Sequence, residues 1–220
     1  MNRRLLGILL VVVVQVQVVR IGRIVRIGRY VKEFAVGDRV FPALASGTFR
    51  EEVRCKAAAC MPAPAGDAIQ LSLLTVNGPT AEVLLEDFAV LEPGDWLVQN
   101  AANSSCGRYL IRLAKLKGVR TVNVVRRAEM IDELRELGGD VVLVDGPDLA
   151  ARVRAAVQNA PIRLGIDAVA GDATQRIAEC LAPGSTVASY GSMTNRRCEL
   201  DFYLMFRQDI RLVGVSFARQ

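Results

Sequence analysis

The sequence predicts an α/β protein in which a doubly wound parallel sheet follows a smaller unit built from β-strands. Three observations lead to this prediction. Short apolar runs alternate strictly with helical segments from Pro93 onward. Glycines separate runs rich in Val, Ile and Phe between Ile21 and Cys55. A composition of 51% hydrophobic and 23% charged residues over 220 positions is typical of a folded chain with a sizeable core.

The first twenty residues, MNRRLLGILLVVVVQVQVVR, permit more than one interpretation. Two arginines ahead of an apolar run have the outline of a signal peptide, and an anchor over residues 5–19 is a further alternative. No A-x-A cleavage site follows, the run is too short to span a bilayer, and Val-Gln-Val-Gln-Val alternates with a period of two. We therefore interpret residues 1–20 as an atypical apolar segment that ends in a strand, and we expect no membrane partner.

Residues 1–66 are predicted to form the first domain. Its strands fall in GRIVRIG, GDRVFPAL and GTFREEVRC, and the proline-rich connector CMPAPAGD follows at residues 60–67. The second domain, residues 67–220, is expected to begin with two helices in IQLSLLTVNGPTAEVLLEDF, interrupted at Asn77-Gly78-Pro79.

The rest of the second domain alternates between strands and helices at the spacing of crossover connections, which predicts parallel strands with helices on both faces of the sheet. Ala128–Gly138 shows the helical pattern, because Ile131, Leu134 and Leu137 share one face. Such sheets bind ligands at the carboxyl ends of their strands. The expected strands are WLVQN, TVNVV, VVLV, IRLGIDAV, STVASYG and IRLVGVSF, and the helices between the first five lie over 107–117, 128–137, 148–158 and 171–182.

The charge pattern favours a small anionic ligand. The formal net charge is +5, from 28 basic and 23 acidic residues, and the excess is arginine spread along the whole chain. No basic stripe with interleaved aromatic residues occurs, so we expect no nucleic-acid partner. The sequence contains no histidine, which removes Ser/His/Asp and Cys/His triads and most catalytic zinc sites, and we expect no metal.

The cysteines predict reduced thiols in an intracellular protein, cytoplasmic with a mitochondrial location as the alternative. Their number is odd and no CxxC spacing occurs. Cys55 and Cys60 lack companions at metal-ligand spacing, so we interpret them as packing residues. Cys106 opens a predicted helix, whose dipole could favour a thiolate, but a buried packing role is the interpretation we favour. The five cysteines are Cys55, Cys60, Cys106, Cys180 and Cys198.

The loop AANSSCG after the first strand of this sheet has the place of a phosphate-binding turn. A dinucleotide fold needs small residues there, because the backbone approaches the pyrophosphate and presents helix N-terminal amides to it. Gly107 is expected to allow close packing of helix and strand. Ser105 stands where a second glycine is expected, which is tolerable if its φ is negative and strained if its φ is positive. Asp167, at the end of a later strand, is interpreted mainly as a cap for the following turn.

Arg126 and Arg127 follow the second strand, where a dinucleotide fold that prefers NAD(H) has an acidic residue. A guanidinium can pair with a 2′-phosphate through two parallel hydrogen bonds, which a carboxylate would repel. The position therefore predicts NADP(H) as cofactor. The alternative is that both arginines are solvated residues at a strand end.

Several segments together resemble the zinc-free branch of the medium-chain dehydrogenase/reductase superfamily, and within it the trans-2-enoyl thioester reductases. They are VKEFAVGDRVFP, GTFREEV, VNGPTAEVLL, LEPGDWLVQNAANSSCG, RTVNVVRR and ASYGSM, and the likeness extends from Gly22 to the end of the sequence. It implies a partial GroES-like β domain followed by a Rossmann-type domain that binds NADP(H).

The resemblance also implies a set of cofactor-binding residues. Asn77 matches a position near the nicotinamide, and Arg126 and Arg127 match the 2′-phosphate site. A pyrophosphate loop, a turn that borders the cofactor and a segment beside the nicotinamide complete the set. They correspond to Asn103, Ser104, Ser105, Cys106 and Gly107, to Tyr190, Gly191, Ser192 and Met193, and to Val215, Ser216 and Phe217.

Proteins of the resembled type reduce an α,β-unsaturated acyl thioester by hydride transfer from NADPH, with a tyrosine of the N-terminal domain linked to protonation. No residue here matches that tyrosine, and Tyr30 lies in a different segment, so the catalytic residues are unassigned. We expect a chain that is incomplete at both ends. The alternatives are a catalytically impaired NADP(H)-binding module and a quinone-reductase-like paralogue that acts through association. The last strand, RLVGVSF, offers an edge through which a homodimer could form.

Overall fold

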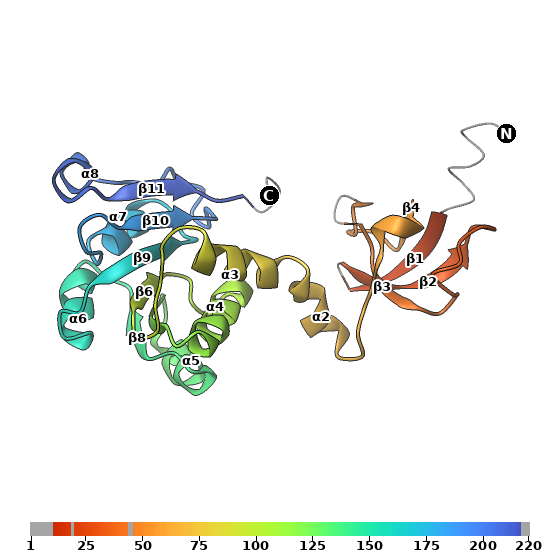
Figure 1. Ribbon diagram of the computed structural model, residues 1–220, viewed down its shortest axis with the longest axis horizontal. Helices are drawn as coiled ribbons and strands as arrows, with labels where there is room; N and C mark the ends of the chain where they lie inside the picture. Colours follow the sequence, from red (N-terminus) through yellow and green to blue (C-terminus); the bar gives the residue numbers. More distant parts are fainter. Residues whose placement is uncertain (1–10, 19, 44–45, 217–220) are drawn as a thin grey trace. The chain divides into compact units, whose positions relative to one another are not determined.

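The computed structural model describes residues 11–18, 20–43 and 46–216. It divides into two compact units, residues 1–76 and 77–220, and each is described by itself (Figure 1). The division falls ten residues later than the sequence suggests, because helix α2 (Ala68–Leu74) contacts strands β1 and β2 of the first unit. Asp67 begins this helix, and its side chain accepts a hydrogen bond from the backbone N–H of Gln70 at 2.9 Å.

The first unit is a five-stranded sheet in the order β4-β1-β2-β3-β5, with antiparallel pairing between neighbours. The alternating run at the start of the sequence is a strand, as predicted, with Val12 and Val14 fully buried. Residues 1–10 lie outside the described part of the chain. The proline-rich connector also holds a short strand that the sequence did not predict. The strands are β1 (Val11–Val18), β2 (Ile21–Ile27), β3 (Arg39–Phe41), β4 (Glu52–Lys56) and β5 (Met61–Pro62), and the 3-10 turn η2 (Ala57–Ala59) joins the last two.

The second unit opens with helix α3 (Asn77–Glu86). The predicted interruption at Asn77-Gly78-Pro79 is wrong by two residues, because the break falls at Thr75 and Val76 and Pro79 lies in the first turn of α3. Proline is tolerated there, since the first N–H groups of a helix have no partner within the helix.

The predicted doubly wound sheet is confirmed. Six parallel strands lie in the order β11-β10-β9-β6-β7-β8, so the order in which strands are added to the sheet reverses between β6 and β9. Helices α6 and α7 lie on one face of the sheet and α3 and α4 on the other (Figure 1). Their apolar side chains belong to two separate core clusters. The strands are β6 (Trp96–Gln99), β7 (Arg120–Val125), β8 (Val141–Val144), β9 (Ile162–Asp167), β10 (Thr186–Ser189) and β11 (Arg211–Gly214). The helices after α3 are α4 (Ser105–Leu116), α5 (Ile131–Leu137), which the 3-10 turn η3 (Ala128–Met130) precedes, α6 (Leu149–Ala156), α7 (Asp172–Ala178) and α8 (Phe202–Gln208).

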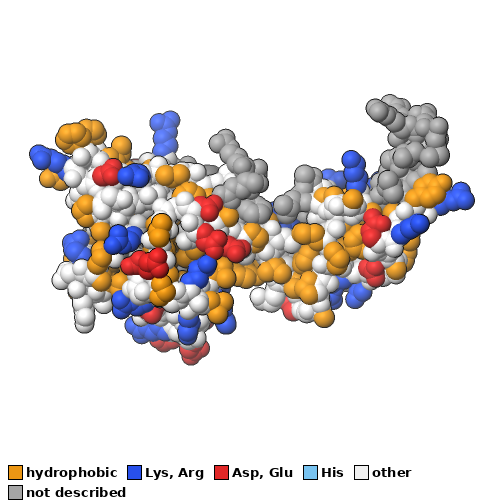
Figure 2. All heavy atoms as spheres, in the orientation of Figure 1, with side chains coloured by type: hydrophobic (Ala, Val, Ile, Leu, Met, Phe, Trp, Pro, Cys, Tyr) orange, Lys and Arg blue, Asp and Glu red, His pale blue; other side chains and the backbone are white. Residues whose placement is uncertain are grey.

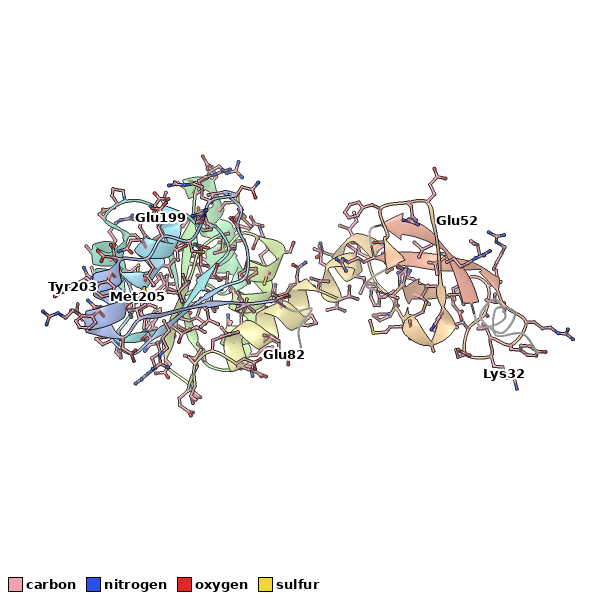
Figure 3. All side chains as sticks on the ribbon, turned by 90° about the horizontal axis from the view of Figure 1, so that it is seen from above. Lys32, Glu52, Glu82, Glu199, Tyr203 and Met205 are labelled. Atoms are coloured by element: carbon pink, nitrogen blue, oxygen red, sulfur yellow. The ribbon has the colours of Figure 1, made fainter. Side chains whose placement is uncertain are left out.

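Helix α8 was not predicted. Its side chains carry no clear apolar stripe, because Phe202, Tyr203 and Phe206 are exposed and Leu204 alone of the helix is buried. Apolar side chains gather on the surface over α8 (Figure 2), and Tyr203 and Met205 point outward from the second unit (Figure 3). The rings of Phe202 and Phe206 stack with their centroids 5.5 Å apart.

Candidate functional site

The carboxyl ends of β6 and β9 are tied together by Asn100 and Asp167. The Asn100 amide donates to Oδ1 of Asp167 at 2.6 Å, and its carbonyl oxygen accepts from the N–H of Ala168 at 2.8 Å. Asp167 is fully buried and also accepts from the N–H groups of Val169 and Ala170 at 2.9 and 3.1 Å, so its predicted role as a cap is confirmed. These hydrogen bonds join the two strands between which the strand order reverses. Sheets of this kind bind ligands at that point.

The loop between β6 and α4 runs close to its own helix at Gly107. A Cβ atom at Gly107 would lie 2.6 Å from the carbonyl oxygen of Ala102, so no larger residue fits without movement of the backbone. The sequence predicted close packing of Gly107 against the strand, but the close approach is to the loop. Ser104 is the N-cap of α4, with φ −69°, and its hydroxyl accepts from the N–H of Gly107 at 3.1 Å.

The backbone at Ser105 does not have the strained conformation that a positive φ would bring. Ser105 is the first residue of α4 and is absent from the described residues with positive φ, so a serine there carries no left-handed strain. The residue of this loop with positive φ is Ala101, at 47°. A non-glycine residue in that region costs about 1 kcal/mol. The strain that the sequence placed at Ser105 therefore lies four residues earlier.

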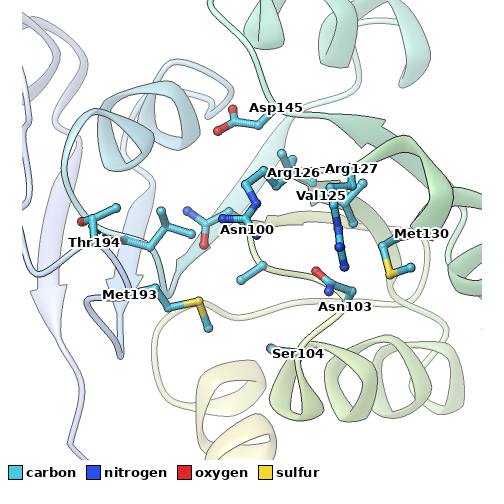
Figure 4. Close-up of a pocket in the computed structure, with 13 residues that line it drawn as sticks. Asn100, Asn103, Ser104, Val125, Arg126, Arg127, Met130, Asp145, Met193 and Thr194 are labelled. Carbon is cyan, nitrogen blue, oxygen red and sulfur yellow. Dashed lines mark hydrogen bonds between the residues drawn. The ribbon is translucent and has the colours of Figure 1, made fainter.

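Arg108 holds the loop against α5. Its Nε donates to the carbonyl oxygen of Asn103 at 3.1 Å, and its Nη1 lies 2.6 Å from Oε1 of Glu133. The hydrogen bond with Glu133 raises the pKa of Arg108, and burial opposes that shift. The loop is thus anchored at Asn103, while the N-terminus of α4 stays directed toward the space above the sheet (Figure 4).

Arg126 and Arg127 emerge at the carboxyl end of β7, as predicted, and both are exposed. Within the part of the chain that the structure describes, neither guanidinium forms an ion pair with a carboxylate. Both line a cavity that the N-terminus of α4 also borders (Figure 4). With no ion-pair partner among the described residues, these two cations beside a helix N-terminus form a candidate site for an anionic ligand.

The cavity has a volume of about 330 Å³ and lies over the carboxyl ends of β6, β7 and β8. It brings together part of the predicted site, namely Asn103, Ser104, Arg126, Arg127 and Met193. It also contains residues that sequence reasoning missed. They are Asn100, Ala101, Val124, Val125, Met130, Asp145, Val169 and Thr194. Asn100 and Asp145 directly follow β6 and β8, and that position at the carboxyl end of a strand is the signal that could have found them.

Asp145 is a charged residue of the cavity wall and belongs to no sequence motif. Arg176 of α7 donates two hydrogen bonds to its carboxylate, from Nε to Oδ1 at 2.8 Å and from Nη2 to Oδ2 at 2.7 Å. This pairing is the main cause of the raised pKa of Arg176, and a second hydrogen bond to Asp172 adds to it. The carboxylate in the wall is therefore neutralised by a bidentate partner, which lets an anion approach the same cavity.

The turn after β10 is fastened to the end of β9. The N–H of Met193 donates to the carbonyl oxygen of Ala168 at 3.1 Å, and the N–H of Thr194 donates to that of Val169 at the same distance. Gly191 allows this approach, because a Cβ there would lie 3.1 Å from the oxygen of Ala168. Met193 and Thr194 thereby reach the cavity, whereas the exposed Ser192 uses its hydroxyl to donate to the carbonyl oxygen of Arg196 at 3.1 Å.

Other predicted site residues do not line this cavity. Cys106 is buried, and burial raises the pKa of its thiol to about 11, so it is the packing residue that we favoured. Burial likewise raises the pKa of Tyr190, and the neighbouring Cys106 thiol adds to that shift. Phe217 lies outside the described residues. The predicted positions away from the cavity are Asn77, Ser105, Cys106, Gly107, Tyr190, Gly191, Ser192, Val215 and Ser216.

Neither a metal centre nor a membrane span is found among the described residues. No three side chains from His, Cys, Asp and Glu come together there in a way that could hold a metal ion. No helix in the same part of the chain has the length and apolar character needed to cross a bilayer.

Comparison with known proteins finds similarity to dehydrogenases and reductases. A family model described as zinc-binding dehydrogenase matches residues 106–220. The chain is 32% identical over 201 residues to the mitochondrial enoyl-[acyl-carrier-protein] reductase of Rattus norvegicus, a match that covers 88% of this chain and 54% of that protein. The chain thus spans about half the length of the curated relatives it matches. This relative is mitochondrial, so the comparison does not support the cytoplasmic location expected from the cysteines.

Two solved structures share the fold. An Etr1p complex with NADP and crotonyl-CoA superposes with a TM-score of 0.81 at 21% identity, over 90% of this chain and 61% of that one. A putative NADPH:quinone reductase from Bacillus thuringiensis gives 0.83 at 20% identity, over 96% and 72%. At these identities the likeness concerns the arrangement of the backbone.

Proposed function

Because the chain belongs to the zinc-binding dehydrogenase family, whose model matches residues 106–220, we propose that its second unit binds NADP(H) and serves the reduction of an α,β-unsaturated acyl thioester. The observation that carries the proposal is the pair of arginines at the end of β7, which form no ion pair within the described part of the chain and share one cavity with the N-terminus of α4. The names of the rat relative and of the Etr1p complex, which include an enoyl reductase, NADP and crotonyl-CoA, support it.

The family name implies zinc, and the described residues do not fit that ion. The sequence has no histidine, and no trio of possible ligands comes together in the described part. We therefore propose a zinc-free protein and derive no step through a metal.

The cavity and its loop fit NADP(H) in three respects. Gly107 lets the loop pass close to α4, Ser104 at the N-terminus of α4 lines the cavity, and Arg126 and Arg127 line it at the end of β7, where a 2′-phosphate would need cations. When bound, the nicotinamide supplies a hydride. The chain's own contribution is to hold the phosphates through α4 and the two arginines, and to border the nucleotide with Met193 and Thr194. The family resemblance adds Asn77, Val215 and Ser216 near the nicotinamide, and the residue that protonates the product is unassigned.

A titration with nucleotides tests the cofactor assignment. We expect saturable binding of NADPH and weaker binding of NADH by nucleotide fluorescence, with Arg126→Ala lowering the affinity for NADPH alone. Arg163→Ala is the matched control, because Arg163 is an exposed arginine in the amino-terminal half of β9, away from the cavity. Equal affinity for both nucleotides in wild type and Arg126→Ala would contradict the assignment.

The substrate class needs a separate measurement. Crotonyl-CoA should accelerate the loss of NADPH absorbance, and a short-chain quinone serves as the competing substrate. Tight NADPH binding with no turnover of either compound would favour the alternative of an NADP(H)-binding module that is catalytically impaired.

One feature favours the alternative in which the protein acts through association. Strand β11 is the edge of the parallel sheet, its residues are exposed, and α8 beside it in the chain exposes Phe202, Tyr203 and Phe206. We propose that two copies pair through this edge to form a homodimer. In sedimentation experiments, Phe206→Glu and Leu212→Glu should each give monomers. Phe49→Glu, a change at an exposed phenylalanine of the first unit, should leave the dimer intact.

Location follows from the relatives and not from the fold. The curated relative in the rat is mitochondrial, and we propose a mitochondrial location for this protein. Imaging of the tagged full-length protein against a mitochondrial marker tests this, and a diffuse cytoplasmic signal would overturn it.

A further inference from the structure

Two cysteines of the first unit meet where the two edges of its sheet are connected. Cys55 lies in β4 and Cys60 directly precedes β5, and these are the first and last strands in the order β4-β1-β2-β3-β5. The turn η2 joins the two strands. The Sγ atoms of Cys55 and Cys60 are 3.2 Å apart, within hydrogen-bonding contact.

The local backbone holds this pair in place. Cys55 sits opposite Val12 in the ladder between β4 and β1. The N–H of Cys60 donates to the carbonyl oxygen of Ala57 at 2.9 Å, which closes η2. Cys60 is 8% exposed and belongs to the core of the unit, whereas Cys55 is half-buried. Cys55 is thus the more exposed residue of the pair.

The two thiols also differ in acidity. The hydrogen bond with Cys60 lowers the pKa of Cys55 to about 7, with help from the backbone of Ala43, although burial opposes the shift. The same hydrogen bond and burial raise the pKa of Cys60. An accessible thiolate beside a protonated thiol is the arrangement of an attacking and a resolving cysteine.

We propose that Cys55 and Cys60 form a reversible disulfide within the chain by exchange with a small-molecule disulfide such as oxidised glutathione. In the first step the Cys55 thiolate attacks one sulfur of the small disulfide, forms a mixed disulfide and releases one thiolate. In the second, Cys60 loses its proton to that thiolate or to solvent and attacks Sγ of Cys55, and the second small thiol departs. The protein loses two electrons and two protons, and the small disulfide becomes two thiols.

The other described cysteines serve as internal controls. Burial raises the pKa of Cys106 to about 11 and that of Cys180 to about 12, and neither has a thiol neighbour among the described residues. Cys198 is half-buried, and its Sγ lies 3.5 Å from the hydroxyl of Ser189. These three should remain free thiols under conditions that oxidise the pair.

The test counts thiols in the full chain after equilibration in a glutathione redox buffer. Intact mass spectrometry after alkylation under denaturing conditions should show five alkylated cysteines in the reduced protein and three in the oxidised protein, with full recovery on reduction. The change should lie at Cys55 and Cys60 in fragment spectra. Five alkylated cysteines at every buffer potential, in wild type, would overturn the proposal.

Variants separate the pair from random oxidation. Cys55→Ser should keep all four remaining thiols. Cys60→Ser should lose at most one, as a mixed disulfide between Cys55 and glutathione, whereas Cys198→Ser should still lose two of its four. Loss of two thiols in Cys55→Ser would also overturn the proposal. If Cys60→Ser fails to fold, the wild-type count and a trivalent arsenical still decide, since the arsenical binds two adjacent thiols and should protect Cys55 and Cys60 from alkylation. Lack of such protection counts against the pair.

Discussion

Arginines lie at both ends of the parallel sheet, but their contacts with the rest of the protein differ between the two ends. At the amino ends, Arg120 donates to the carbonyl oxygen of Gly94 at 2.8 and 3.1 Å and lies over the ring of Trp96, 4.5 Å from its centroid. At the carboxyl ends, Arg126 and Arg127 face a cavity without an acidic partner among the described residues. The difference teaches that exposure and residue type do not distinguish the two ends, whereas the lack of a described acidic partner beside a cavity does, and this makes the carboxyl end the candidate ligand site.

The largest effect is expected in the loop between β6 and α4, at the carboxyl end of the parallel sheet. Gly107→Ala would place a Cβ 2.6 Å from a backbone oxygen, so the loop must move, which should lower the free energy of unfolding by about 3 kcal/mol and abolish NADPH binding. Denaturant titration and nucleotide fluorescence measure the two effects. Gly214→Ala is the control, because open space surrounds that glycine. A Gly107→Ala protein with unchanged affinity would show that the loop does not carry the ligand.

The next effect concerns the arginines of the cavity. Arg126→Ala removes the charge-assisted hydrogen bonds that we propose for a 2′-phosphate, each worth about 1.5–3 kcal/mol, so the Kd for NADPH should rise about tenfold to a hundredfold. The Kd for NADH and the midpoint of unfolding should change little. Calorimetric titration with both nucleotides gives the answer, and a parallel loss for NADH would assign Arg126 to the diphosphate instead.

The opposite pattern is expected at the other end of the sheet. Arg120→Ala removes two hydrogen bonds and a contact with an indole ring, and should lower the free energy of unfolding by about 1 kcal/mol without altering NADPH affinity. Urea unfolding with and without nucleotide tests this. A weaker affinity in Arg120→Ala would erase the distinction between the two ends.

The smallest effect should come from Ala101. Ala101→Gly relieves a positive φ of 47° but adds chain entropy to the unfolded state, so a gain in stability of about 0.5 kcal/mol is expected. Ala155→Gly, at an exposed position inside α6, is the control and should lose about 1 kcal/mol. Equal losses in both variants would mean that the loop is unstrained.

Periodicity predicted the parallel sheet because each strand and crossover helix is encoded locally, and the resemblance to a dehydrogenase family is confirmed by the family match. Helix α8 escaped prediction because its exposed face is apolar, which removes the amphipathic signal. Asp145 escaped because its role depends on Arg176, 31 positions away, and such a pairing has no local signature. Ser105 was questioned because a motif predicts residue types and not dihedral angles.

The buried carboxylate of Asp167 gives the cavity a polarity. It accepts hydrogen bonds from the N–H groups of Val169 and Ala170, and from the hydroxyl of Thr174 at 2.7 Å. These donors are therefore already used by Asp167. We expect the diphosphate of the proposed nucleotide to be held at α4 and at the end of β7 instead. The direction in which that nucleotide lies across the sheet would then depend partly on Asp167.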